Sequence, residues 1–126
     1  VLVHDAARPL VDDAVIERVL GRLDGTVEGV VPALEVHDTL KRVSSEVVVE
    51  TVEREGLVAV QTPQAFLADR LRVAYAGDLA GATDCASLVE RQGGRVAVVE
   101  GDPRLAKVTT AADLEHVEQL LDRSDP

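Results

Sequence analysis

Five polar residues follow apolar stretches of the sequence and have side chains suited to binding a phosphorylated molecule. In chain order they are Asp5, Arg8, Thr62, Gln64 and Lys107. Ligands bind open α/β sheets outside the carboxyl ends of the strands, so we expect these side chains to lie at one edge of a sheet. A carboxylate can bind Mg²⁺ through one oxygen, and arginine and lysine neutralise phosphate oxygens. The set therefore predicts a site for a metal-bound phosphate.

Each of these residues also has an ordinary structural explanation. Asp5 capping a turn and pairing with Arg8 explains the opening motif equally well. Thr62 is placed to cap a helix whose first residue is Pro63, and taken alone it favours that role. Lys107 is typical of a solvated lysine at a sheet edge. The convergence of these residues on one edge favours a site more than any one of them does.

Other candidate chemistries find less support in the sequence. The chain has three histidines: His4, His37 and His116. They show neither metal-ligand spacing nor a nucleophile arrangement, so we expect them at surface or turn positions. Asp84 is expected to interact with the N-terminus of its own helix. The chain has no glycine-rich phosphate loop, because Gly93 and Gly94 end a predicted helix instead of opening one.

The elements that must position these residues alternate between strand and helix patterns. We expect strands at 1–3, 26–34, 57–61 and 95–101, and helices within 10–25, 62–80, 81–94 and 110–126. Pro32 predicts a bend or a sheet edge in the second strand, and Thr83 is expected to open the third helix. Thr110 with Asp113 resembles a capping box. The alternation predicts a layered α/β sheet built on strand, helix, strand units.

Apolar residues at helical spacing predict which helix faces pack inward. For the second helix the expected face is Phe66, Leu67, Leu71, Ala74 and Tyr75, and for the last helix it is Leu114, Val117, Leu120 and Leu121. The first and third apolar strand stretches, 1–3 and 57–61, are expected to be buried.

Residues 36–56 have the alternating pattern of a hairpin with one wet face, with Ser44 and Ser45 at its turn. A two-stranded hairpin standing alone is marginal in water, so its apolar face should pack on another surface, for which a second subunit is the expected partner. We predict a projecting dimerisation arm.

The composition limits the class of protein. A chain of 126 residues with 46% hydrophobic and 29% charged residues is typical of one soluble globular domain. The net charge of −10, with one Phe, one Tyr and no Trp, argues against nucleic-acid binding, while a small anionic substrate stays compatible with it. No apolar run suits a membrane-spanning helix. The lone Cys85 excludes an internal disulfide and favours a cytoplasmic setting.

The chain opens inside a predicted strand and contains no methionine. We therefore expect it to be the later part of a longer protein.

Six motifs, in order, carry a resemblance to a known family: VLVHDAARP, VHDTLKRV, TVEREGL, QTPQAF, GATDCAS and AKVTTAADL. Across essentially the whole chain they resemble 2-C-methyl-D-erythritol 4-phosphate cytidylyltransferases, enzymes of the non-mevalonate isoprenoid pathway. The resemblance implies a Rossmann-like nucleotidyltransferase sheet, mostly parallel and incomplete at the N-terminus. Residues 1–126 would form the C-terminal part of one domain, and 36–56 its hairpin arm.

The resemblance also implies an activity and an assembly. The family joins CTP to methylerythritol phosphate with Mg²⁺, releasing pyrophosphate, as a homodimer whose arms reach into the partner's active site. A phosphate monoester is mostly a dianion at neutral pH, so the substrate phosphate is itself the nucleophile and no general base is needed. The protein has to hold two anions together and stabilise their charge.

Roles for single residues follow from the matching motifs. Asp5 corresponds to the acid that binds Mg²⁺, and with Ala6 and Arg8 it forms the expected nucleotide contacts. Asp5, Arg8 and Lys107 form the expected catalytic set.

The matching motifs also assign contacts to the second substrate. Thr39 and Arg54 correspond to arm residues that grip the methylerythritol phosphate group across the dimer interface. Thr62 and Lys107 correspond to contacts with the same phosphate from the first subunit.

Two features depart from the family pattern and keep alternatives open. The glycine-rich CTP loop of the family's N-terminal half is absent, so the 126-residue chain alone is expected to be inactive. Cys85 stands where relatives often have an acid, and residues 103–107 differ from the usual approach to the lysine. One alternative is a cytidylyltransferase for another polyol phosphate, such as ribitol phosphate. Another is a non-catalytic dimerising or phosphate-binding module.

Overall fold

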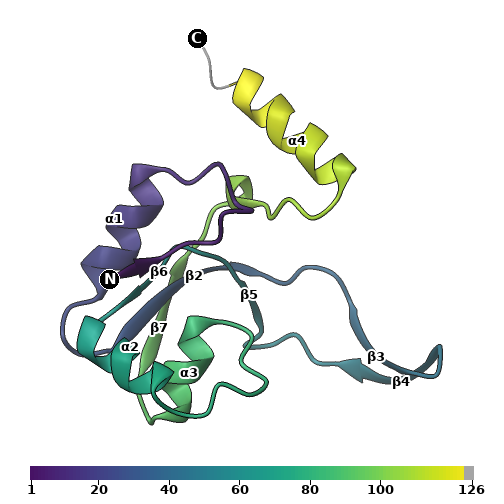
Figure 1. Cartoon of the computed structure of the whole chain (residues 1–126). Coiled ribbons are helices and arrows are strands. Elements are labelled where there is room, and N and C mark those ends of the chain that lie inside the picture. Colours follow the sequence, from purple (N-terminus) through teal and green to yellow (C-terminus); the bar gives the residue numbers. More distant parts are fainter. Residues whose placement is uncertain (124–126) are drawn as a thin grey trace.

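The computed structural model describes residues 1–123, which form a sheet covered by helices, a projecting hairpin and a C-terminal helix (Figure 1). In chain order the elements are β1 (Leu2–Val3), α1 (Asp13–Arg22), β2 (Gly29–Glu35), β3 (Leu40–Ser44), β4 (Val47–Val52), β5 (Val58–Val60), β6 (Gln64–Phe66), α2 (Ala68–Tyr75), α3 (Cys85–Arg91), β7 (Val96–Glu100), the 3₁₀ helix η1 (Pro103–Leu105) and α4 (Ala111–Asp122).

The sheet is centred on β2 and is mixed. β7 runs parallel to β2 on one side, while β5 and β6 run antiparallel to β2 on the other, and β1 is antiparallel to β6. The α/β class is confirmed, but among the described strands only the pairing of β2 with β7 is parallel, fewer than expected. The chain leaves β2 through the hairpin and returns at β5 without a crossover helix, and such a return produces antiparallel pairing.

β5 and β6 form one strand with a break in the middle. Ala33 of β2 pairs with Val60 of β5, and Val30 of β2 pairs with Ala65 of β6. Pro32 lies opposite the break, and its carbonyl accepts a 2.8 Å hydrogen bond from the Gln61 N–H. Pro32 is therefore inside the central strand, and its expected place at a bend or edge is wrong. A residue without an N–H fits where the partner strand is interrupted.

The break also changes how α2 begins. Thr62 and Pro63 lie in the break, β6 follows them, and α2 starts only at Ala68 after Leu67. The prediction that Thr62 caps a helix starting at Pro63 is therefore wrong. Phe66 belongs to β6 rather than to a helix face.

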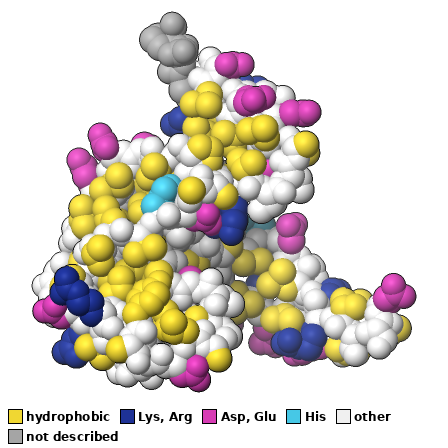
Figure 2. Space-filling model, viewed as in Figure 1, with side chains coloured by type: hydrophobic (Ala, Val, Ile, Leu, Met, Phe, Trp, Pro, Cys, Tyr) yellow, Lys and Arg dark blue, Asp and Glu magenta, His cyan; other side chains and the backbone are white. Residues whose placement is uncertain are grey.

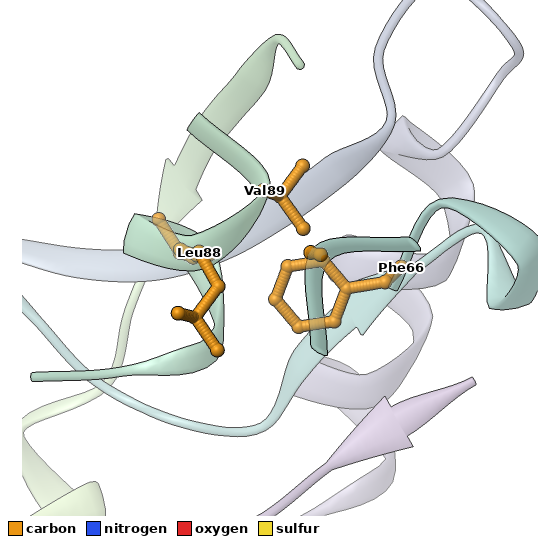
Figure 3. Close-up of a cluster of buried hydrophobic side chains, with 6 residues drawn as sticks. Phe66, Leu88 and Val89 are labelled. Atoms are coloured by element: carbon orange, nitrogen blue, oxygen red, sulfur yellow. The ribbon is translucent and has the colours of Figure 1, made fainter. Parts of the chain in front are cut away.

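Alternating residues of the sheet feed two apolar layers. Val30 and Ala65 pack with Val19 of α1 on one face, while their neighbours Val31 and Phe66 pack on the other face against α2 and α3. Successive strand residues point to opposite faces, which is why each strand supplies both layers. Figure 3 shows the Phe66 ring close to Leu88 and Val89 of α3. In Figure 1, α1 accordingly lies on one side of the sheet, and α2 and α3 lie on the other.

Several positions expected to be buried are exposed. Leu2 of β1 and Val58 of β5 are solvent-exposed, because each strand has a partner on one side only. On α4, Val117 is buried, but Leu114 is 48% and Leu121 50% exposed. Hydrophobic side chains are accordingly visible on α4 in Figure 2. The predicted inward face of α4 is thus covered in part only.

The hairpin of residues 36–56 is confirmed. β3 and β4 form a separate two-stranded sheet that projects from the body (Figure 1). Its turn lies at Ser45 and Glu46, one residue later than expected, and both have the positive φ angles of a tight hairpin turn. Along β4, Val47, Val48 and Val49 are all exposed.

Side-chain caps fix the ends of the helices that lead to and from the sheet. The Thr110 and Asp113 capping box is confirmed at the start of α4. Asp84 caps α3 by accepting from the Ser87 N–H, which confirms its expected interaction with the N-terminus of its own helix. The expectation that Thr83 opens this helix is wrong by one residue. Within residues 1–123, no helix has the length and apolar character to cross a membrane.

Candidate functional site

The turn after β1 holds the Asp5 side chain in a fixed position. The Arg8 N–H donates to the Asp5 carbonyl at 2.9 Å, and the Ala7 N–H donates to Asp5 Oδ1 at 3.1 Å. Aspartate commonly closes turns in this way, by accepting from the backbone two residues on. Ala6 lies exposed between these contacts. The turn therefore leaves the second carboxylate oxygen, Oδ2, to face another partner.

That partner is Lys107. Its Nζ lies 3.0 Å from Asp5 Oδ2, with side chains that are 50% exposed for Lys107 and 29% for Asp5. The Lys107 hydrogen bond holds the pKa of the Asp5 carboxyl below its ordinary value, and the Ala7 N–H lowers it further. Asp5 is thus a carboxylate at neutral pH. The ion pair of Asp5 is with Lys107 and not with Arg8, so the local pairing considered from the sequence is not the one that forms.

Arg8 turns toward the segment that carries Lys107. Its guanidinium donates to the Leu105 carbonyl at 2.6 Å, and the Val108 N–H donates to the Ala7 carbonyl at 2.8 Å. Among the described residues, Arg8 Nε is a buried nitrogen with no hydrogen-bond acceptor. The Arg8 guanidinium thus adds a positive charge beside Asp5, and this charge contributes to the lowered pKa of the Asp5 carboxyl.

Thr62 lies in this site and not at a helix start. Its Oγ1 accepts from the Asp5 N–H at 3.0 Å and lies 3.0 Å from His4 Nδ1. His4 Nε2 is 2.8 Å from the Arg8 carbonyl. A carbonyl only accepts, so in a neutral ring Nε2 carries the proton and Nδ1 accepts from the Thr62 hydroxyl. Asp5, Thr62, His4 and Arg8 then form a closed chain of hydrogen bonds.

His4 is a site neighbour that sequence reasoning missed. It was expected at a surface or turn position, and its side chain is exposed, yet it links Thr62 to Arg8. No spacing signal could have found this, since the contact to Thr62 depends on β1 pairing with β6.

Gln64, the remaining strand-end candidate, points elsewhere. Its buried amide donates to Asp84 Oδ2 at 3.1 Å and accepts from the Ala86 N–H at 3.3 Å. It therefore ties β6 to the start of α3 instead of joining the cluster around Asp5.

The arm residues stand apart from this cluster. Thr39 and Arg54 are both exposed near the base of the hairpin, and Arg54 donates to the His37 carbonyl. Of the predicted residues, the structure brings together Asp5, Ala6, Arg8, Thr62 and Lys107. Within residues 1–123, no hydrogen bond or ion pair is seen between the two arm residues and this group.

Asp5 is the carboxylate available to a metal ion in this cluster. Among the described residues, no group of three or more His, Cys, Asp or Glu side chains could hold a metal by itself. Mg²⁺ does not require such a group, because it commonly binds one or two carboxylates together with substrate phosphates and water. Each oxygen of Asp5 keeps a lone pair beyond its present hydrogen bond. The donor set therefore fits Mg²⁺ carried by a phosphorylated substrate.

The chain matches one family of proteins over nearly its full length. Residues 1–123 match the family model described as IspD, 2-C-methyl-D-erythritol 4-phosphate cytidylyltransferase. A protein of this description from Nocardia farcinica is 54% identical over 123 residues, which cover 97% of this chain and 53% of that protein. One from Saccharopolyspora erythraea is 49% identical over 124 residues, covering 96% and 54%.

Solved structures agree in fold. The crystal structure of the cytidylyltransferase from Thermus thermophilus aligns with a TM-score of 0.84 and 38% identity, covering 96% of this chain and 61% of that one. A crystal structure of 4-diphosphocytidyl-2C-methyl-D-erythritol synthase aligns with a TM-score of 0.86 and 42% identity, covering 96% and 56%. The chain spans about half the length of the curated single-function relatives. These matches show that the chain belongs to the 2-C-methyl-D-erythritol 4-phosphate cytidylyltransferase family.

Proposed function

We propose that the protein transfers CMP from CTP to 2-C-methyl-D-erythritol 4-phosphate. The products are 4-diphosphocytidyl-2-C-methyl-D-erythritol and pyrophosphate, in non-mevalonate isoprenoid biosynthesis. The observation that carries this proposal is the meeting of the turn that holds Asp5 and Arg8 with the distant segment that carries Lys107, in a chain of this family.

The chemistry asks the protein to bring two anions together. The phosphate of the polyol is a dianion near neutral pH, so it attacks the α-phosphorus of CTP without a protein base. The Lys107 ammonium is half exposed, so it can bind a phosphate oxygen and offset the charge that builds up during transfer. Arg8, whose charge acts on Asp5, supplies a second cation near the phosphates. Pyrophosphate leaves as the new phosphoanhydride bond forms.

Asp5 is the residue that would hold Mg²⁺. Bound there, the ion would neutralise phosphate charge and favour pyrophosphate as a leaving group. The contribution of the chain is to present the Asp5 carboxylate ionised and fixed. The Ala7 N–H and the Lys107 ammonium orient the carboxylate, the Thr62 hydroxyl holds the Asp5 backbone N–H, and the lowered pKa of Asp5 keeps the group charged.

The arm supplies the remaining contacts in this proposal. Thr39 and Arg54 would bind the polyol phosphate in the active site of a second subunit, as expected from the sequence. Their place on the arm, away from the Asp5 cluster, is compatible with a role in trans. Val47, Val48 and Val49, exposed on the arm, give it an apolar surface to bury in a homodimer.

We propose further that residues 1–126 alone do not turn over substrate. The chain spans about half of its curated relatives, and its sequence holds no glycine-rich loop for the CTP phosphates.

The lone Cys85 supports a cytoplasmic setting.

A substrate panel tests the proposed reaction. The full-length protein is incubated with CTP and Mg²⁺ and either methylerythritol 4-phosphate or ribitol 5-phosphate, and pyrophosphate and the CDP-alcohol are quantified. We expect product with methylerythritol phosphate. Product formed with ribitol phosphate alone would show that the protein is a cytidylyltransferase for that polyol phosphate. Turnover with neither substrate would favour the non-catalytic alternative, a module that dimerises or binds phosphate.

The same assay applied to the 126-residue chain tests the second proposal. Its intact mass is first checked against 13.4 kDa. CDP-alcohol formed by this species would overturn the expected lack of activity.

A further inference from the structure

Gln61 lies in the break between β5 and β6, and both polar atoms of its side-chain amide bond the backbone of Asp102. Its Oε1 accepts from the Asp102 N–H at 3.0 Å, and its Nε2 donates to the Asp102 carbonyl at 2.9 Å. Gln61 is buried, with 5% of the residue exposed. A buried amide that makes both bonds to one residue clamps that residue in position and in orientation.

The clamped position is where the chain leaves the sheet toward Lys107. Gly101, just before Asp102, donates its N–H to the Ala33 carbonyl at 2.8 Å. Arg18 of α1 donates to the Glu100 carbonyl at 3.0 Å and to the Gly101 carbonyl at 3.4 Å. The end of β7 is therefore held by β2, by α1 and by Gln61.

The stretch from Asp102 to Lys107 is short and anchored. The Asp102 side chain caps η1 by accepting from the Arg104 N–H at 2.8 Å, and Leu105 is fully buried. Lys107 lies two residues beyond Leu105. The short segment that carries Lys107 thus begins at the clamped Asp102 and runs over the anchored η1.

Gly101 shows how closely the clamp fits. A Cβ at this residue would lie 2.3 Å from Gln61 Oε1, closer than atoms can approach, and 3.0 Å from the Ala33 carbonyl oxygen. Gly101 does not have a positive φ, so its missing side chain is explained by this approach and not by its backbone angles.

The neighbouring residue holds the other half of the ion pair. Thr62 accepts from the Asp5 N–H, so two consecutive residues contact the two segments that carry Asp5 and Lys107. We propose that Gln61 is a positioning residue for Lys107, which sets where the ammonium meets Asp5 and the substrate phosphate. This inference rests on the proposed function for its effect on catalysis.

A double-mutant cycle in the full-length protein separates positioning from general stability. Gln61→Leu leaves the Asp102 N–H and carbonyl without partners, and we expect kcat/KM for cytidylyl transfer to fall by about 10- to 100-fold. In a Lys107→Ala background the same substitution should cost less than about 3-fold, because its effect acts through the missing ammonium. Equal losses in both backgrounds would overturn the proposal.

Two further variants keep the test independent of one substitution. Gly101→Ala adds a Cβ that displaces the Gln61 amide. Its loss of kcat/KM should be smaller in the Lys107→Ala background, as for Gln61→Leu. Gln64→Leu is the matched control, since Gln64 is a buried amide three residues away that bonds Asp84 and Ala86 and, at 3.4 Å, the backbone carbonyl of Gln61, but not its side chain. Its effect should be the same with and without Lys107. If the loss of kcat/KM caused by Gln64→Leu also disappeared in the Lys107→Ala background, the result would count against a specific role for Gln61.

Hydrogen exchange tests the positioning without reference to activity. The Val108 N–H donates to the Ala7 carbonyl, so its exchange reports how well the Lys107 segment is held against the Asp5 turn. We expect Gln61→Leu to speed this exchange by about 10-fold or more relative to the β7 amides, and Gln64→Leu to leave the ratio unchanged. Unchanged exchange in Gln61→Leu would refute the positioning role. Faster exchange combined with a Lys107→Ala variant of normal activity would instead refute the proposed function of the site.

Discussion

Lys107 Nζ lies 3.0 Å from Asp5 Oδ2, and this ion pair joins a segment near the start of the chain to one near its end. Both side chains reach solvent, so a bound phosphate can compete with Asp5 for the ammonium. The pair therefore keeps a cation and the carboxylate proposed to hold Mg²⁺ side by side. Its surroundings lead to the following expectations.

Substituting Lys107 by Ala should reduce the turnover of the full-length protein. In the proposed reaction the ammonium offsets charge on the phosphates during transfer, and removing one such donor typically costs about 10²- to 10³-fold in kcat. Steady-state pyrophosphate release measures the loss. Arg72→Ala is the control, because Arg72 is exposed on α2 and forms its ion pair with Asp69 of the same helix. Loss of activity of the same size in both variants would contradict a specific role for Lys107.

Thr62→Val should destabilise the protein, because it keeps the shape of the side chain and removes the acceptor of the Asp5 N–H. One such hydrogen bond contributes about 1 kcal/mol to the free energy of unfolding. Urea denaturation measures it, with Thr26→Val as the control. Thr26 is exposed and bonds Asp24, so its substitution should change stability by less than about 0.5 kcal/mol. Equal stability of Thr62→Val and wild type would argue against this bond.

Asp113 should titrate with a pKa of about 2. The backbone N–H and hydroxyl of Thr109 lower it first, and Thr110 adds to the effect. Because the folded pKa lies below the unfolded value of about 4, the group stabilises α4 fully above about pH 4 and loses this effect as the pH falls toward 2. NMR titration of the side-chain carbonyl carbon measures the pKa. A pKa of about 4 for Asp113 would contradict the capping geometry. So would an Asp113→Asn variant whose free energy of unfolding falls with decreasing pH as in wild type.

Val49→Glu should weaken the proposed dimer. Val49 is exposed in the arm strand β4, and a charge buried there on association would lack a partner. Sedimentation of the full-length protein should shift toward monomer, whereas Val73→Glu, at an exposed position of α2, should leave the dimer intact. A wild-type protein that sediments as a monomer would remove the basis for Thr39 and Arg54 acting in trans.

The parts of the site that follow strand ends could be predicted from the sequence. Asp5 follows the end of β1, and the end of an apolar strand is a local property of the chain. Lys107 was expected at the same edge, and it does meet Asp5, but it follows η1 and not a strand. The hairpin and the Thr110 capping box were predictable for the same reason, since each is encoded within a few neighbouring residues.

The parts that depend on strand pairing could not be predicted. Thr62 followed by Pro63 matches a helix start locally, and only the pairing of β6 with both β1 and β2 makes it a break in a strand. Gln61 and His4 gain their contacts through that break. The exposed Leu114 was unpredictable for another reason, because periodicity identifies the apolar face of α4 without saying what covers it.

The central claim is that Asp5 and its neighbours carry a Mg²⁺-dependent transfer. Its most direct test is Mg²⁺-dependent pyrophosphate release from CTP and methylerythritol 4-phosphate by the full-length wild type, Asp5→Asn and Asp69→Asn. Asp69 is an exposed acid of α2, so its variant should match wild type. Asp5→Asn should lose about 10²-fold or more in turnover at saturating Mg²⁺. Near-normal turnover by Asp5→Asn would contradict the account.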